Sequence, residues 1–227
     1  MFSELSVGQL CGILLLFILI TSALSQSLAG AVLNAADVPG TLSKVAASDK
    51  KFRIGVVIDL ISHVSVIALA GLLYIAFSPY GQPLALIGTL WRVTEGTIVA
   101  LGEVNNFVLL AVAQKFNSAT GAVMVTLETL GRTRIVAEES GLKIGLTFFA
   151  FGHLAYAILF VSSGAVPSVL GWWGVVASFL AVAGILLAFI NPNVSSVIKS
   201  VSFFPIILYE VALGIWLLLR GGQIGQL

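Results

Sequence analysis

Apolar residues run through this sequence in six long blocks that are separated by shorter polar connections. Each block is long enough to cross the hydrocarbon core of a bilayer as a helix, which takes about 20 residues. The blocks are Val7–Leu28, Ile54–Phe77, Pro83–Val112, Ile144–Val161, Val166–Ile190 and Val201–Leu219. The pattern predicts an all-α fold, a polytopic membrane bundle of six transmembrane helices that forms one integral membrane domain over residues 1–227.

The connections predict which helices are neighbours. Ser78–Pro83 and Ser163–Pro167 are short turns without charge, so helices two and three, and helices four and five, should pack as antiparallel hairpins. Residues 29–53 are polar and basic and are expected to form a loop. Ala119–Leu130 is apolar but too short to cross, which predicts a short interfacial helix between the third and fourth helices.

Composition supports a membrane location. Hydrophobic residues make up 59% of the chain and charged residues only 9%, whereas a typical soluble domain has about 25% charged residues. The formal net charge of +1 gives no indication of nucleic acid as a partner. The expected partners are the lipid bilayer and either further copies of this chain or a larger membrane complex.

The basic residues are distributed unevenly about the predicted helices. Nine of the eleven Lys and Arg residues lie in or beside the connections after the first, third and fifth blocks: Lys44, Lys50, Lys51, Arg53, Lys115, Arg132, Arg134, Lys143 and Lys199. Arg220 alone lies on the opposite side, and Arg92 lies inside the third block. Because basic residues favour the cytoplasmic side, we expect a multipass protein of the cytoplasmic (cell) membrane with both termini on the outer side.

The first block is expected to be a retained helix and not a signal peptide, because no Lys or Arg precedes it. Cys11 is the only cysteine, which excludes an internal disulfide. Its apolar surroundings predict a buried, unreactive thiol.

Polar side chains form a stripe along the third block. At about 100° per helical residue, Arg92, Glu95, Glu103 and Asn106 fall on one face. Charged groups at membrane depth face the bundle interior and find partners there. Together with polar residues of the second, fourth and sixth blocks, they predict a buried polar cluster: Asp59, His63, Arg92, Glu95, Glu103, Asn106, His153 and Glu210.

Depth along the helices predicts one ion pair within this cluster. Arg92 lies nine residues from Pro83 and Glu210 lies ten residues from Arg220, which places both roughly 13 to 15 Å from the same side of the bilayer. We therefore expect Arg92 to pair with Glu210, with Glu95 as a second partner one turn away.

Two classes of function fit these features. The first is a structural or accessory subunit of a membrane complex, favoured by the absence of any soluble catalytic domain or recognised catalytic motif. The alternative is a membrane-embedded enzyme or small-solute carrier that uses Asp59, Arg92, Glu95, Glu103 and Glu210. No metal or cofactor is expected; a haem held by His63 and His153, which lie at similar depths, is the alternative.

Several short motifs, in order, resemble those of one known family. They are Arg53-Ile-Gly-Val-Val-Ile-Asp-Leu60, Trp91-Arg-Val-Thr-Glu95, Phe151-Gly-His-Leu154, Val166-Pro-Ser-Val-Leu-Gly171, and Glu210 followed by Trp216-Leu217. Taken together, the chain resembles a bacterial and archaeal multipass membrane family catalogued as domain of unknown function 4386. The resemblance covers nearly the whole chain and implies a bundle of about six helices in the cytoplasmic membrane. It implies no activity, cofactor or catalytic residue.

Overall fold

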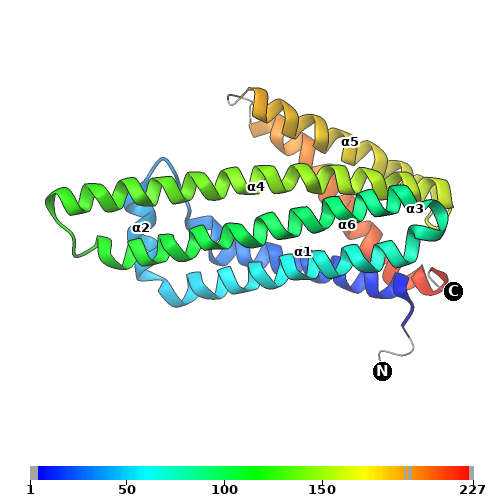
Figure 1. Cartoon of the computed structure of the whole chain (residues 1–227), viewed down its shortest axis with the longest axis horizontal. Coiled ribbons are helices and arrows are strands. Elements are labelled where there is room, and N and C mark those ends of the chain that lie inside the picture. The colour runs from blue at the N-terminus through cyan, green and yellow to red at the C-terminus, as the bar shows by residue number, and fades with distance from the viewer. Residues whose placement is uncertain (1–4, 192, 194–195, 225–227) are drawn as a thin grey trace. The chain divides into compact units, whose positions relative to one another are not determined.

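The computed structural model describes residues 5–191, 193 and 196–224, and every regular element among them is helical. The elements are α1 (Val7–Leu28), η2 (Gly30–Val32), α2 (Val38–Ala47), α3 (Asp49–Phe116), α4 (Gly121–Ser163), α5 (Ser168–Ile190), α6 (Ser196–Arg220) and η3 (Gly221–Gln223) (Figure 1). The predicted all-α fold is confirmed. The side chain of Lys199, counted above among the basic residues, lies outside the described part of α6.

Five of the described helices are long and apolar enough to cross a membrane, namely α1, α3, α4, α5 and α6. The helix α3 has 68 residues and includes both the second and the third apolar block. It folds back at Gly81, which has non-helical backbone angles (φ 167°, ψ 74°) between Pro79 and Pro83. The hydroxyl of Thr89 reaches the carbonyl of Ala70 across this hairpin at 3.5 Å, so the two arms are antiparallel neighbours as predicted.

Two connections differ from their predictions. Ala119–Leu130 is not a separate short helix; most of it forms the beginning of α4, which continues without interruption to Ser163. The polar stretch that follows Leu130 has no proline and so can keep the helical hydrogen bonds. The predicted loop over residues 29–53 contains α2, because Asp37 caps its N-terminus by accepting a 2.9 Å hydrogen bond from the amide of Gly40.

The chain divides into two compact units. Unit 1 comprises Met1–Leu19, Ser65–Thr97 and Ile144–Leu227, and unit 2 comprises Ile20–Val64 and Ile98–Lys143. The boundaries between the units fall inside α1, α3 and α4, whereas boundaries between independent domains usually fall in exposed linkers. The prediction of one integral membrane domain stays a prediction.

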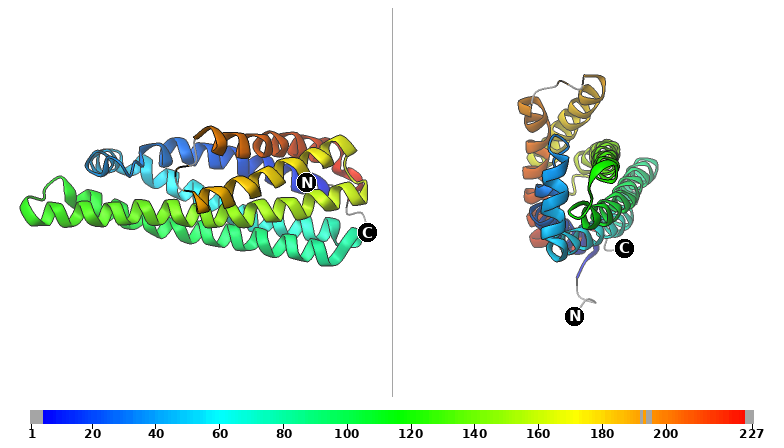
Figure 2. Two further views of the ribbon diagram at one scale, coloured as in Figure 1. Left: turned by 90° about the horizontal axis from the view of Figure 1, so that it is seen from above. Right: turned by 90° about the vertical axis from the view of Figure 1, so that its left-hand side faces the viewer.

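Unit 1 is held together by close helix contacts around an apolar core. Its largest fully buried side chains include Phe77, Leu159, Ile206, Tyr209 and Leu217. Helices α5 and α6 pack against each other and are seen as an adjacent pair in Figures 1 and 2. The connection between α4 and α5 turns at Gly164, whose φ of 64° is in the left-handed region that favours glycine.

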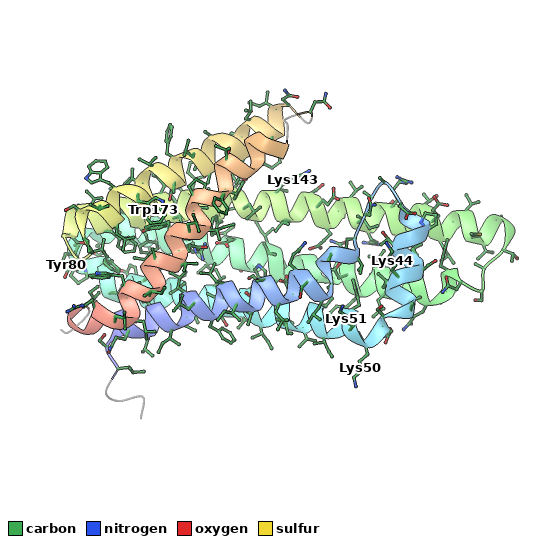
Figure 3. The ribbon with its side chains drawn as sticks, turned by 180° about the vertical axis from the view of Figure 1, so that it is seen from behind. Lys44, Lys50, Lys51, Tyr80, Lys143 and Trp173 are labelled. Carbon is green, nitrogen blue, oxygen red and sulfur yellow. The ribbon has the colours of Figure 1, made fainter. Side chains whose placement is uncertain are left out.

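Unit 2 has its own apolar core. The buried face of α2, formed by Val38, Leu42 and Val45, contributes to a cluster that also contains Phe52 and Ile135. The opposite side of this segment is basic and exposed: Lys44, Lys50 and Lys51 gather around the junction of α2 and α3 in Figure 3. The arms of α3 are also antiparallel here, since the amide of Gln114 donates a 2.9 Å hydrogen bond to Asp49.

We predict that Gly12→Ala destabilises the protein, because α1 and α6 touch through their backbones at this point. A Cβ atom at Gly12 would lie 2.5 Å from the amide nitrogen of Leu218 and 2.8 Å from the carbonyl oxygen of Gly214. Such overpacking typically costs about 1 to 3 kcal/mol. The measurement is thermal unfolding of the purified protein in one detergent.

The matched control is Gly71→Ala, in the middle of the first arm of α3. A Cβ atom there would meet nothing within 4 Å, and alanine favours the helix by about 1 kcal/mol over glycine. The control should unfold at the same temperature as the parent or higher. Equal melting temperatures for Gly12→Ala and the parent would contradict the close contact between α1 and α6.

Candidate functional site

Four ionisable side chains meet in the interior of unit 1, and we call them the charged cluster: Arg92, Glu95, His153 and Glu210. They come from three helices, α3, α4 and α6. Arg92 is only 2% exposed, and Glu95 and Glu210 are each 6% exposed. All of the cluster is drawn from the predicted set of buried polar residues.

Arg92 lies along α4 and reaches a partner on its own helix. Its Nη1 atom is 2.8 Å from Oε2 of Glu95, one helical turn away, in a close ion pair without hydrogen-bond alignment. The guanidinium carbon lies 5.0 Å from the centre of the Phe149 ring, a cation–π arrangement. Gly152 makes room for the aliphatic part of Arg92, because a Cβ atom there would lie 2.8 Å from its Cδ atom.

Glu210 pairs with His153, and this contact joins α6 to α4. The His153 Nε2 atom is 2.9 Å from Oε1 of Glu210. The Arg92–Glu210 pair predicted from depth is not formed: no ion pair within 4.0 Å joins these two side chains in the described part of the chain. The partner of Arg92 is Glu95, which was predicted as its second partner. Matched depth brings residues to one level of a bundle, but the direction around each helix decides which of them touch.

The two pairs form one electrostatic group. Arg92 of one pair and His153 of the other line the same small cavity, so no layer of water separates the two pairs. The four side chains therefore interact electrostatically as one group, and protonation of one member changes the electrostatic energy of the others.

Aromatic rings and a small cavity surround the cluster. The ring centre of His153 lies 4.4 Å from that of Phe149 and 6.4 Å from that of Tyr209. Beside Arg92 and His153 lies a cavity of about 20 Å³, which Cys11 and Tyr156 also line. That volume holds about one water molecule.

A larger hollow lies elsewhere in unit 1. It has a volume of about 660 Å³, and its lining includes Gln9, Tyr80, Trp216 and Arg220. Sequence reasoning did not identify it as a site, because its residues come from chain segments that have no common motif. The basic side chain of Arg220 belongs to the last turn of α6.

The remaining four predicted residues, Asp59, His63, Glu103 and Asn106, belong to unit 2. His63 Nδ1 lies 2.8 Å from the Asp59 carbonyl oxygen and 3.4 Å from the Asp59 carboxylate. Asn106 donates a 3.0 Å hydrogen bond to Glu103, and both side chains are buried. The carboxyl groups of Asp59 and Glu103 are neighbours in the same network.

Sequence reasoning missed three further members of this unit 2 network: Asn105, Arg134 and Glu138. Arg134 Nη1 lies 3.4 Å from the Asn105 side-chain oxygen. The Glu138 carboxylate lies against the same part of α3, since a Cβ atom at Gly102 would be 3.1 Å from its Oε2 atom. Glu138 precedes the fourth apolar block, and its burial raises the pKa of its carboxyl group. Arg134 and Glu138 are four residues apart on a continuous helix, and this spacing was the signal that could have identified these two residues.

The two histidines have separate surroundings. His153 is engaged by Glu210 in unit 1, and His63 is engaged by Asp59 in unit 2. Among the described residues there is no group of three or more His, Cys, Asp and Glu side chains arranged to hold a metal ion.

The charged cluster can hold helices together and exchange a proton, since its members are ionisable and are in contact in pairs.

Comparison with known proteins gives one match. A family model described as "Domain of unknown function (DUF4386)" matches residues 10–221. Neither the search of curated proteins nor the search of solved structures gave a match.

We predict that Arg92→Leu costs about 3 to 5 kcal/mol of stability, because it leaves the buried Glu95 carboxylate without its cation. Combining it with Glu95→Leu removes one charge of each sign and should recover most of that loss. The measurement is a double-mutant cycle from thermal or denaturant unfolding in detergent. Strictly additive effects would contradict the pair.

The exposed pair Glu128–Arg132 of α4 provides the matched control. Its charged atoms are 3.9 Å apart, with side chains 37% and 52% exposed. Removing either partner of such a pair usually changes stability by less than about 1 kcal/mol. A loss at Arg132→Leu as large as that at Arg92→Leu would show that burial does not set the cost.

Proposed function

Because the chain belongs to the DUF4386 family, which carries no assigned activity, we propose its function from its own geometry: a structural or accessory subunit of a membrane complex. The apolar helices support an integral membrane protein. The subunit role rests on how the charged cluster is arranged.

The observation that carries the proposal is the closed state of the charged cluster. Its four side chains are paired with one another, and the adjacent cavity of about 20 Å³ has room for one water molecule but not for an organic solute. Small-molecule sites usually have volumes of about 300 to 1,000 Å³. The cluster is therefore better suited to joining α3, α4 and α6 than to holding a substrate.

The outward side of α5 supports contact with lipid or with another subunit. Its small residues Gly174 and Ala177 are buried within unit 1, so they serve internal packing. The exposed side of the helix is large and apolar, with Trp172, Val176 and Phe179 at helical spacing. Lipid tails are as apolar as these side chains, so the hydrophobic effect would not drive a partner onto this face. A partner would bind there through close side-chain packing.

A second candidate function is the binding of a small solute, and the larger hollow favours it. Its volume of about 660 Å³ falls in the range of small-molecule sites. The hollow differs from the site proposed for a carrier from sequence, since Gln9, Tyr80, Trp216 and Arg220 line it. Solute-dependent stabilisation that is lost in Arg220→Gln would favour this function over the subunit role.

We further propose six membrane crossings in the cell membrane, with both termini outside. The two arms of α3, either side of Gly81, count as separate crossings. At 1.5 Å per residue the 43-residue α4 is roughly 64 Å long, about twice the hydrocarbon thickness. Part of α4 therefore lies beyond the hydrocarbon core, and its first turns, which include most of Ala119–Leu130, extend on the cytoplasmic side.

The topology predicts that Lys51 faces the cytoplasm and Gln82 faces outwards. Both side chains are exposed. In a Cys11→Ala background, Lys51→Cys should resist a membrane-impermeant thiol reagent added to intact cells, whereas Gln82→Cys should react. Permeabilised cells provide the control in which both react. If Lys51→Cys alone reacted in intact cells, the orientation would be the opposite of the one proposed.

The subunit role predicts that some exposed apolar positions, and not others, cross-link to a partner protein. A photoreactive phenylalanine analogue would replace Phe179 of α5, Phe204 of α6 or Leu101 of α3, which are 63%, 60% and 65% exposed. In native membranes, we expect a discrete protein adduct from one or two of these positions. Adducts to lipid alone at all three positions would contradict a subunit role, and an adduct of two copies would indicate a homo-oligomer.

A further inference from the structure

The charged cluster has an unequal number of acidic and permanently basic side chains. Arg92 carries a charge of +1 at every accessible pH, whereas Glu95 and Glu210 are both acids. With both carboxylates ionised and His153 neutral, the cluster has a net charge of −1. A single added proton brings it to zero.

Burial makes this difference costly. Arg92, Glu95 and Glu210 are each 6% exposed or less, so bulk water does not compensate a net charge there. Arg92 pairs with Glu95, while the ion-pair partner of Glu210 among the described residues is the titratable His153. The 2.9 Å separation between His153 Nε2 and Glu210 Oε1 suits either imidazolium with carboxylate or imidazole with carboxylic acid.

We propose that the charged cluster binds one exchangeable proton within the apolar interior of unit 1. The proton neutralises the cluster, and its loss leaves one uncompensated negative charge. This inference goes beyond the subunit role and does not depend on it, since it follows from the composition and geometry of the cluster alone.

The groups that face the cluster do not change this count. On α3 these are Arg92 and Glu95 themselves, on α4 the phenol of Tyr156 lies one turn from His153, and on α6 Tyr209 precedes Glu210. The thiol of Cys11 on α1 lines the same cavity. Phenols and thiols are uncharged at neutral pH, and α5 has no titratable residue in its sequence.

A cavity with room for one water molecule lies beside the pair. The cavity of about 20 Å³ is lined by both Arg92 and His153 and holds about one water molecule, which can accept or deliver the proton. On α6, the adjacent residues Trp216 and Leu217 line the larger hollow and the small cavity respectively.

The test is the pH dependence of unfolding of the full-length protein in nanodiscs. In the parent protein, the unfolding equilibrium constant should rise by up to about tenfold per pH unit from neutral to alkaline pH, the slope for one proton retained by the folded state. Glu210→Gln and Glu95→Gln each remove one acid and make the cluster neutral without the proton. Either variant should reduce this slope by the share of one proton and be more stable than the parent at alkaline pH.

Glu139→Gln is the matched control, because Glu139 is an exposed glutamate of α4 and should leave the slope unchanged. If both cluster variants fail to fold, infrared difference spectra of the parent decide instead: raising the pH should remove a carboxylic-acid or imidazolium band. A flat pH profile of the parent, an unchanged slope in both cluster variants, or no such band would overturn the proposal. Suppression of the slope by sodium but not by choline would show that a monovalent cation occupies the site in place of a proton.

Discussion

Burying charge inside an apolar helical bundle is the constraint on which the rest of unit 1 depends. A lone ionised side chain at the centre of a bilayer costs at least about 2.5 kcal/mol, and more when a former partner is removed. The chain places Arg92, Glu95, His153 and Glu210 together and pairs each of them. Because the pairs draw on three helices, satisfying the charges also determines which helix faces turn inwards.

The small residues near the cluster follow from the same constraint. Gly152 gives Arg92 space to lie against α4, and Gly174 of α5 gives space to Tyr209, the neighbour of Glu210. A side chain at Gly152 would displace Arg92, and one at Gly174 would displace the Tyr209 ring. The polar interior and the close helix packing therefore depend on each other. Glycines leave room for the large side chains between the helices, and the ion pairing stabilises the packed helices.

The sequence was sufficient for the fold class, because apolar blocks of membrane length and a proline-flanked turn leave few alternatives to a helical membrane bundle. It was less informative about connections, since the polar residues after Leu130 can form either a loop or a helix. It also identified the charged residues and named Glu95 as a second partner of Arg92, but the first partner that it predicted, Glu210, pairs with His153 instead. Depth is readable from spacing along one helix, whereas the partner depends on the rotation and crossing of three helices, which no local pattern contains.

Buried pairing, and above all the contact between His153 and Glu210, joins α4 to α6. A double-mutant cycle with His153→Leu and Glu210→Leu measures this contact most directly, using unfolding of the protein in nanodiscs. We expect a coupling free energy within the range of about 0.5 to 3 kcal/mol found for residues in contact. A coupling free energy indistinguishable from zero, with each single variant as stable as the parent, would contradict it.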